Sequence, residues 1–96
     1  MDSKQQALVD KYEAKREQVE ARLQLLKARA KEAGAERRVE LNEQIEALEA
    51  RKASAQSRLD DLREAGEDAW QDLADGAESA WKSLGEALDR AADRFS

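Results

Sequence analysis

Apolar residues recur at alternating intervals of three and four positions through the first third of the chain, a spacing typical of a coiled-coil helix. This first run contains Val9, Tyr12, Arg16, Val19, Leu23, Leu26, Ala30 and Ala33. Its one charged member, Arg16, is of the kind that fixes the register of a coiled coil. A second run with the same spacing contains Leu41, Ile45, Leu48, Lys52, Ala55, Leu59 and Leu62. We therefore predict helix across residues 1–64.

The two runs are out of phase on either side of Gly34. Four-residue steps through positions 33, 37, 41 and 45 join them, and such a shift is a stutter within one continuous helix. The surrounding stretch, KEAGAERR, has no Ser, Thr, Asp or Asn to cap a new helix. An isolated glycine costs only about 1 kcal/mol inside a helix. We therefore expect a continuous helix through Gly34. A turn there is the alternative, because glycine is also common just after a helix ends.

An eleven-residue repeat follows, in the units LDDLREAGEDA, WQDLADGAESA and WKSLGEALDRA. Eleven residues span three helical turns, so this repeat holds its apolar residues on one stripe. In the last third of the chain the stripe carries Trp70, Leu73, Trp81, Leu84, Leu88 and Phe95, and the opposite face is rich in Asp and Glu. Residues 65–96 are thus predicted to form an acidic amphipathic helix. We expect a turn near Gly66 before it, with Asp75-Gly76 as the other turn candidate.

These elements predict an all-α fold. The expected architecture is an elongated coiled-coil helical hairpin, in which a long heptad-patterned helix over residues 1–64 is followed by the shorter Trp-bearing helix over residues 65–96. The alternative is a three-helix bundle with turns near Gly34 and Gly66, which divide the chain into near-equal thirds.

The number of large side chains bears on whether one copy is enough. The chain has 20 large apolar or aromatic residues and 19 alanines among its 96 residues. Alanine lets helices approach closely but buries little surface, so the core of one copy is thin. We therefore predict a homo-oligomer, in which contact between copies adds to the buried surface.

Charge divides the chain near Arg58. Residues 1–58 carry 13 Lys and Arg against 11 Asp and Glu, whereas residues 59–96 carry 4 against 11. Antiparallel contact between the g positions of the first two runs would oppose two basic edges, Lys15, Arg22 and Arg29 against Arg37, Arg51 and Arg58. Like charges at such positions are unfavourable by a few tenths of a kcal/mol each. We therefore expect the acidic C-terminal helix to be the antiparallel partner of the basic edge.

The chain has no histidine and no cysteine. The usual zinc and transition-metal sites and the Ser-His-Asp and Cys-His nucleophiles are therefore excluded, and no glycine-rich phosphate loop is present. We predict a protein that is not an enzyme and uses no cofactor or metal. A net charge of −5 argues against nucleic acid as a partner. The first residues have no apolar run of the kind found in a signal peptide, so we expect a cytoplasmic location.

The C-terminal pattern DAWQDLADGAESAWKSLGEALDRAADRF contains two Ala-Trp pairs, Ala69-Trp70 and Ala80-Trp81, and a final aromatic residue, Phe95. Together with the Lys/Glu-rich first part, it resembles small uncharacterised bacterial coiled-coil proteins with a C-terminal Ala-Trp repeat. The pattern is also loosely similar to the amphipathic helices of the exchangeable apolipoproteins. The resemblance implies a helical, cytoplasmic protein without enzymatic activity.

The predicted function is self-association and protein–protein interaction, as a scaffold or adaptor, through burial of the apolar seams. The predicted interaction residues are Val19, Leu23, Leu26, Ile45, Leu48, Leu59, Leu62, Trp70, Leu73, Trp81, Leu84, Leu88 and Phe95. The alternative is weak, peripheral binding to a lipid surface through the Trp stripe, although interfacial helices usually carry Lys and Arg on their polar face. A hydrophilic protein that becomes ordered only on binding is a third alternative.

Overall fold

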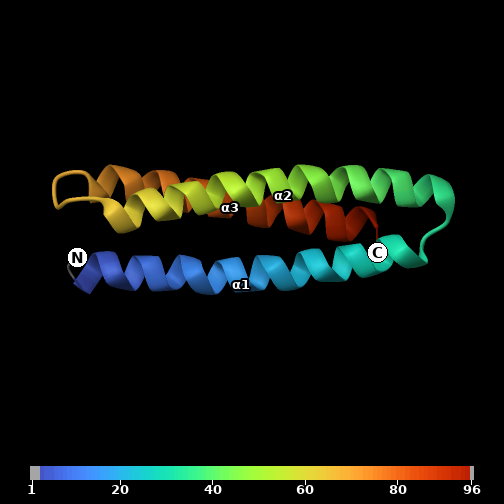
Figure 1. The fold of residues 1–96 in the computed structure, drawn as a ribbon, viewed down its shortest axis with the longest axis horizontal. Helices are drawn as coiled ribbons and strands as arrows, with labels where there is room; N and C mark the ends of the chain where they lie inside the picture. Colours follow the sequence, from blue (N-terminus) through green and yellow to red (C-terminus); the bar gives the residue numbers. More distant parts are fainter. Residues whose placement is uncertain (1–2, 96) are drawn as a thin grey trace.

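Three helices arranged side by side make up the structure, a computed structural model that describes residues 3–95 (Figure 1). Helix α1 spans Ser3–Glu32, α2 spans Ala35–Glu64 and α3 spans Trp70–Arg94. Helix α2 runs antiparallel to the other two, and the bundle measures 51 × 18 × 16 Å. The all-α prediction is confirmed, and the described residues adopt the alternative architecture, the three-helix bundle.

The prediction of a continuous helix through Gly34 is wrong. Helix α1 ends at Glu32 and α2 begins at Ala35, so Ala33 and Gly34 form a two-residue turn. Gly34 has a φ of −65° and a ψ of 166°, an extended conformation that takes the chain out of the helical path. No side chain caps the start of α2. The phase shift between the two apolar runs is therefore caused by a turn and not by a stutter.

A side chain from α2 holds the end of α1 in place. The Nε of Arg38 donates a hydrogen bond to the Ala30 carbonyl oxygen at 3.1 Å, and its Nη2 donates to those of Ala33 and Lys31 at 3.1 and 3.3 Å. The last carbonyl groups of a helix have no partner within the helix, so such contacts stabilise its end. These hydrogen bonds from one charged side chain stabilise the end of the helix at a point where the local residues favour its continuation.

The ends of α2 and α3 are held in the same way, by side chains from other helices. Gln5 of α1, which is 2% exposed, donates through Nε2 to the carbonyl oxygens of Leu62 at 2.9 Å and Ala65 at 3.0 Å. Arg37 of α2 donates through Nη2 to the Arg94 carbonyl oxygen at 3.0 Å. All three C-terminal ends are thus fixed to a neighbouring helix by a long polar side chain.

The predicted turn near Gly66 is present. Residues 65–69 connect α2 to α3, and the backbone N–H groups of Ala69 and Trp70 both donate to the Gly66 carbonyl oxygen at 3.2 Å. The first unit of the eleven-residue repeat is therefore divided between the end of α2 and this turn. The other turn candidate, Asp75-Gly76, lies inside α3.

One core runs along the bundle and receives side chains from all three helices. Its apolar members are Val9, Tyr12, Val19, Leu23, Leu26, Ala30, Leu41, Ile45, Leu48, Ala55, Leu59, Leu62, Ala74, Ala77, Trp81, Leu84, Leu88, Ala91 and Phe95. The charged members of the two three-four runs, Arg16 and Lys52, are only partly buried and face polar side chains of the neighbouring helix. The spacing of the runs therefore follows the line along which each helix meets the core.

Truncation of a core leucine is expected to destabilise the bundle far more than truncation of an exposed one. Leu59 is 0% exposed, whereas Leu25 is 63% exposed. Leu59→Ala leaves a cavity, so the free energy of unfolding should fall by about 2–5 kcal/mol. Leu25→Ala should change it by less than about 0.5 kcal/mol. Urea denaturation followed by circular dichroism measures both, and equal effects would contradict the placement of Leu59.

Loss of the Gln5 side chain is expected to weaken the end of α2. Gln5→Ala leaves two carbonyl groups without this donor, which should lower the free energy of unfolding by about 1–3 kcal/mol. The matched control is Gln6→Ala, because Gln6 is exposed and, among the described residues, its side chain hydrogen-bonds only to Asp10 one turn away, at 2.8 Å. That control should lose less than about 0.5 kcal/mol. Thermal denaturation of the two variants side by side is the test.

Candidate functional site

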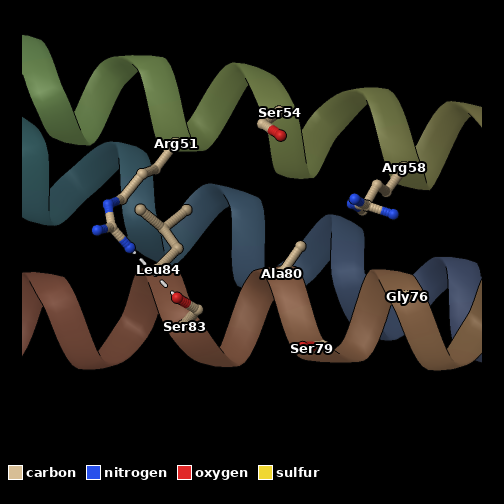
Figure 2. Close-up of a pocket in the computed structure, with 8 residues that line it drawn as sticks. All are labelled: Arg51, Ser54, Arg58, Gly76, Ser79, Ala80, Ser83 and Leu84. Atoms are coloured by element: carbon tan, nitrogen blue, oxygen red, sulfur yellow. Dashed lines mark hydrogen bonds between the residues drawn. The ribbon is translucent and has the colours of Figure 1, made fainter.

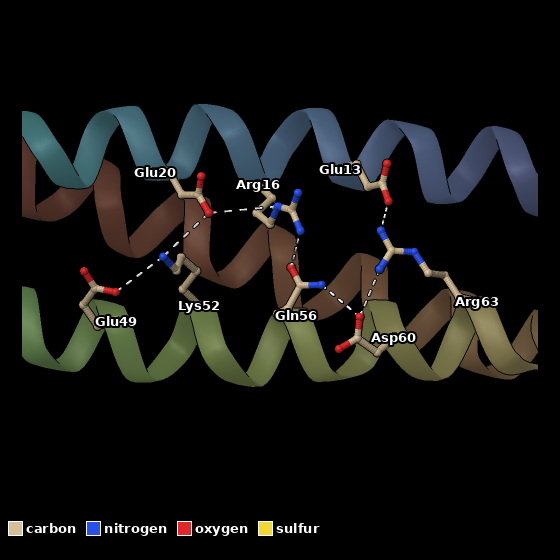
Figure 3. Close-up of polar contacts among 8 residues, drawn as sticks. All are labelled: Glu13, Arg16, Glu20, Glu49, Lys52, Gln56, Asp60 and Arg63. Carbon is tan, nitrogen blue, oxygen red and sulfur yellow. Dashed lines mark hydrogen bonds and ion pairs between the residues drawn. The ribbon is translucent and has the colours of Figure 1, made fainter.

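Opposite charges neutralise one another along the boundary between α1 and α2 (Figure 3). Lys27 lies 2.9 Å from Glu49, and Lys52 lies 3.9 Å from Glu20. Further along, the Arg63 guanidinium pairs with Glu13 and also with Asp60 of its own helix. Figure 3 shows Lys52 reaching toward Glu20, and Arg63 toward Glu13, between the two helices. This boundary therefore offers little net charge to a partner.

The contacts explain where the charge argument from the sequence failed. An antiparallel pair of helices can meet along its e positions as well as along its g positions. Helices α1 and α2 meet along their e positions, where Glu13 faces Arg63 and Lys27 faces Glu49. The basic g edges of both helices instead flank α3, which runs antiparallel to α2, as expected, but parallel to α1.

Glu49 is the acidic group most affected by this boundary. Its hydrogen bond with the Lys27 ammonium lowers the pKa of the Glu49 carboxyl below its usual value, and the nearby charge of Lys52 adds to the effect. The carboxylate form is therefore favoured in the folded protein.

A groove between α2 and α3 differs from this neutral boundary in its chemistry. It has a volume of about 390 Å³. We call it the arginine groove, and its lining residues are Arg51, Ser54 and Arg58 of α2 and Gly76, Ser79, Ala80, Ser83 and Leu84 of α3. Figure 2 shows the two arginine side chains extending from α2 over the small residues of α3.

Small residues on α3 create the space in which the arginine side chains lie. A Cβ atom at Gly76 would be only 3.2 Å from the Arg58 Nη1, so the absence of a side chain allows the guanidinium to approach. The Arg51 Nη1 donates to the Ser83 Oγ at 3.2 Å. The two arginines are seven residues apart, which places their Cα atoms two helical turns or about 10.5 Å apart on one side of α2.

The arginine groove has no acidic lining residue. None of the ion pairs within residues 3–95 involves Arg51, Arg58 or Arg90. A second hollow of about 350 Å³ continues the groove past Arg51, and Arg90 and Arg94 line it on the α3 side. Of these arginines, Arg94 has an acidic neighbour, Glu40 at 3.5 Å. A row of exposed guanidinium groups thus follows the α2/α3 boundary in a chain whose net charge is −5.

The predicted interaction residues lie elsewhere, in the core. Eleven of the thirteen are buried, namely Val19, Leu23, Leu26, Ile45, Leu48, Leu59, Leu62, Trp81, Leu84, Leu88 and Phe95. Trp70 and Leu73 are partly buried and pack against the same core. In one copy these side chains therefore cover one another and form no free surface.

Sequence reasoning did not identify the arginine groove. The arginines at g positions were visible, but they were assigned to contact with acidic residues of the C-terminal helix. The missed signal is the side of α3 on which the residues are small or basic, at positions 76, 79, 80, 83, 90 and 94. Such a stripe next to arginines indicates a groove without carboxylates.

Two further properties concern the described residues as a whole. No helix within residues 3–95 is both long enough and apolar enough to cross a membrane. No group of three or more acidic side chains in this range is arranged to hold a metal ion.

Comparisons with protein-family models, with curated proteins and with solved structures found no match. The resemblance of the Ala-Trp pattern to bacterial coiled-coil proteins stays a prediction.

The lowered pKa of Glu49 predicts a pH-dependent contribution to stability. The ordinary value is 4.5. A depressed pKa stabilises the folded state above that pH, and the contribution is lost as the pH falls below it. Glu49→Gln should therefore lower the free energy of unfolding by up to about 1 kcal/mol at neutral pH, because the pair is partly exposed.

At acidic pH the Glu49 carboxyl is protonated and therefore uncharged, like the glutamine of the variant. The difference in stability between Glu49→Gln and the original chain should then disappear. Glu46→Gln is the matched control, because Glu46 is exposed on the same helix. Thermal denaturation across the pH range measures both. A Glu49→Gln effect that stays constant down to the lowest pH would show that the ion pair is not its cause.

Proposed function

We propose that the protein is a non-enzymatic helical adaptor that binds an acidic helix of another protein in the arginine groove. The observation that carries the proposal is the set of exposed arginines along the α2/α3 boundary, of which Arg51, Arg58 and Arg90 have no carboxylate partner within residues 3–95. Arginine binds carboxylates through paired N–H donors, and arginine is enriched at protein interfaces.

The spacing of the groove favours a helical partner. Arg51 and Arg58 are one heptad apart on α2. Carboxylates at seven-residue spacing on a helix laid along the groove would lie at the same interval of about 10.5 Å. The hydroxyl groups of Ser54, Ser79 and Ser83 add donors and acceptors between the two arginines. The partner would become a fourth helix on the bundle.

The charge distribution also favours a short acidic helix as the partner, rather than an extended anionic surface. The outer side of α3 carries exposed carboxylates, among them Asp72, Glu86 and Asp93. A nucleic-acid duplex or an anionic bilayer would meet these groups as well as the arginines, and like charges repel. A single helix can contact the groove without contacting that outer side.

The other predictions about function and location stand as proposals beside this one. Lipid binding through the Trp stripe requires the bundle to open, because Trp81 is 3% exposed and Phe95 is 6% exposed. Self-association through the seam residues requires the same opening. The cytoplasmic location is supported by the lack of cysteine in a chain of this size.

Binding of an acidic model peptide tests the proposed function. The probe is a fluorescein-labelled amphipathic peptide of about 20 residues, a length that allows helix formation, with glutamates at seven-residue intervals. The same peptide with glutamines in those positions is the ligand control. Fluorescence anisotropy should detect binding of the first peptide only, and the affinity should fall as salt is raised.

The double variant Arg51→Gln with Arg58→Gln should weaken binding by about tenfold or more, because two charge-assisted contacts are lost. The control is Lys15→Gln with Arg29→Gln, which makes the same change in net charge on exposed positions of α1. It should alter the affinity by less than about twofold. Equal losses in the two double variants would mean that only net charge matters and would refute a specific site.

A further inference from the structure

We infer that the hairpin formed by α1 and α2 opens at Gly34 and that two opened chains exchange their α1 helices. In the resulting dimer, residues 3–64 of each chain form one continuous helix. Each α1 lies against α2 and α3 of the other chain. The partner is therefore a second copy, and the surface that it fits is the one α1 covers within a single chain.

The turn has the geometry of a short hinge. Only Ala33 and Gly34 separate the two helices. The φ of Gly34, −65°, is already that of an α-helix, and the turn departs from helix at that residue through its ψ of 166° instead of about −42°. A Cβ atom at Gly34 would have no neighbour within 4 Å, so nothing packs against the turn there. Short hinges of this kind favour domain swapping.

The local sequence prefers the open form of the hinge. Every neighbour of Gly34 in KEAGAERR is a good helix former, and no side chain caps the start of α2. The four-residue steps from position 33 to position 45 supply the stutter that a continuous helix needs. Local preference and tertiary structure thus disagree at this one point, which lowers the free-energy difference between the two forms.

Exchange preserves the contacts that hold the bundle together. The ion pair between Lys27 and Glu49 can form between chains instead of within one. The same holds for the contact between Arg22 and Asp89, at 2.5 Å, and for the hydrogen bonds from Gln5 to the end of α2. The closed and exchanged forms then differ only at the turn, as in other swapped dimers.

The Arg38 side chain stabilises the closed form, which is the single-chain bundle with its turn at Gly34. Its guanidinium donates to the carbonyl oxygens of Ala30, Lys31 and Ala33. In a continuous helix these carbonyls would accept from backbone N–H groups four residues further along, and the Arg38 contacts would be redundant. Removal of the side chain therefore costs the closed form stability that the exchanged form does not lose.

The dimer would differ from the single chain in shape as well as in mass. A helix over residues 3–64 is about 90 Å long at 1.5 Å per residue, whereas the single-chain bundle is 51 Å long. The dimer would also carry two copies of the arginine groove, which allows bivalent binding. That last consequence rests on the proposed function, but the exchange itself does not.

The test compares Arg38→Ala with Lys31→Ala. The second variant removes a charge at the same turn but keeps the hydrogen bonds from Arg38. Sedimentation equilibrium gives the mass and small-angle scattering gives the length. Arg38→Ala should lower the dissociation constant of the dimer by about 100-fold, because each of the two closed single chains that form a dimer loses the Arg38 hydrogen bonds. The maximum dimension should rise toward about 90 Å. Lys31→Ala should remain like the original chain.

Adding Gly34→Pro to Arg38→Ala should restore the monomer. Proline fits the observed φ of −65° but interrupts a continuous helix. Insertion of Gly-Gly-Ser after Gly34 is a second block, for use if proline reduces the helix content measured by circular dichroism. Exchange is refuted if Arg38→Ala is a monomer at every concentration. It is also refuted if the Arg38→Ala dimer persists in the folded blocking variants.

Discussion

The structure depends on a single shared core, because the chain has too few large side chains to build two. Within residues 3–95, all large apolar residues except Leu25 and Val39 lie in this core or against it. Its members include alanines of α2 and α3, such as Ala55 and Ala77 at 0% exposure, and such small side chains allow helices to pack closely. A long unbroken helix would leave the apolar stripe of α1 out of reach of the other two. The turn at Gly34 brings that stripe onto the same core.

Positions that face the core of a helical bundle are apolar at regular intervals, so the core residues could be predicted from the sequence. The three-four runs and the eleven-residue repeat identified the stripes of all three helices, and the turn near Gly66 was expected. The turn at Gly34 was not, because every local signal there favours helix. The turn is stabilised by burial of the α1 stripe on the core and by Arg38, whose guanidinium donates to carbonyl oxygens at the end of α1. Hydrogen bonds between a side chain and distant backbone have no signature in helix propensities or periodicity.

Charge patterns were informative about partners and misleading about architecture. The basic g edges do flank α3, but the α2 edge meets no carboxylate in the arginine groove, whereas Arg22 of α1 pairs with Asp89. The error was to treat the g edges as the only surfaces on which α1 and α2 could meet. Their e edges carry complementary charges, with Glu13 facing Arg63 and Lys27 facing Glu49. An antiparallel pair has two edges, so repulsion along one of them excludes one arrangement of the helices and not the pair itself.

The arginine groove follows from the way α3 divides its side chains between its two neighbours. On the side toward α1 it presents acidic groups, such as Asp89 beside Arg22. On the side toward α2 it presents small residues, so the basic edge of α2 meets no carboxylate there. Close contact between helices would be served equally well by alanine at those positions. Serine at position 83 instead places a hydroxyl group beside Arg51 without adding bulk, and Ser79 adds another to the lining. Helix contact alone does not require those hydroxyls, whereas binding of a carboxylate beside the arginines would use them.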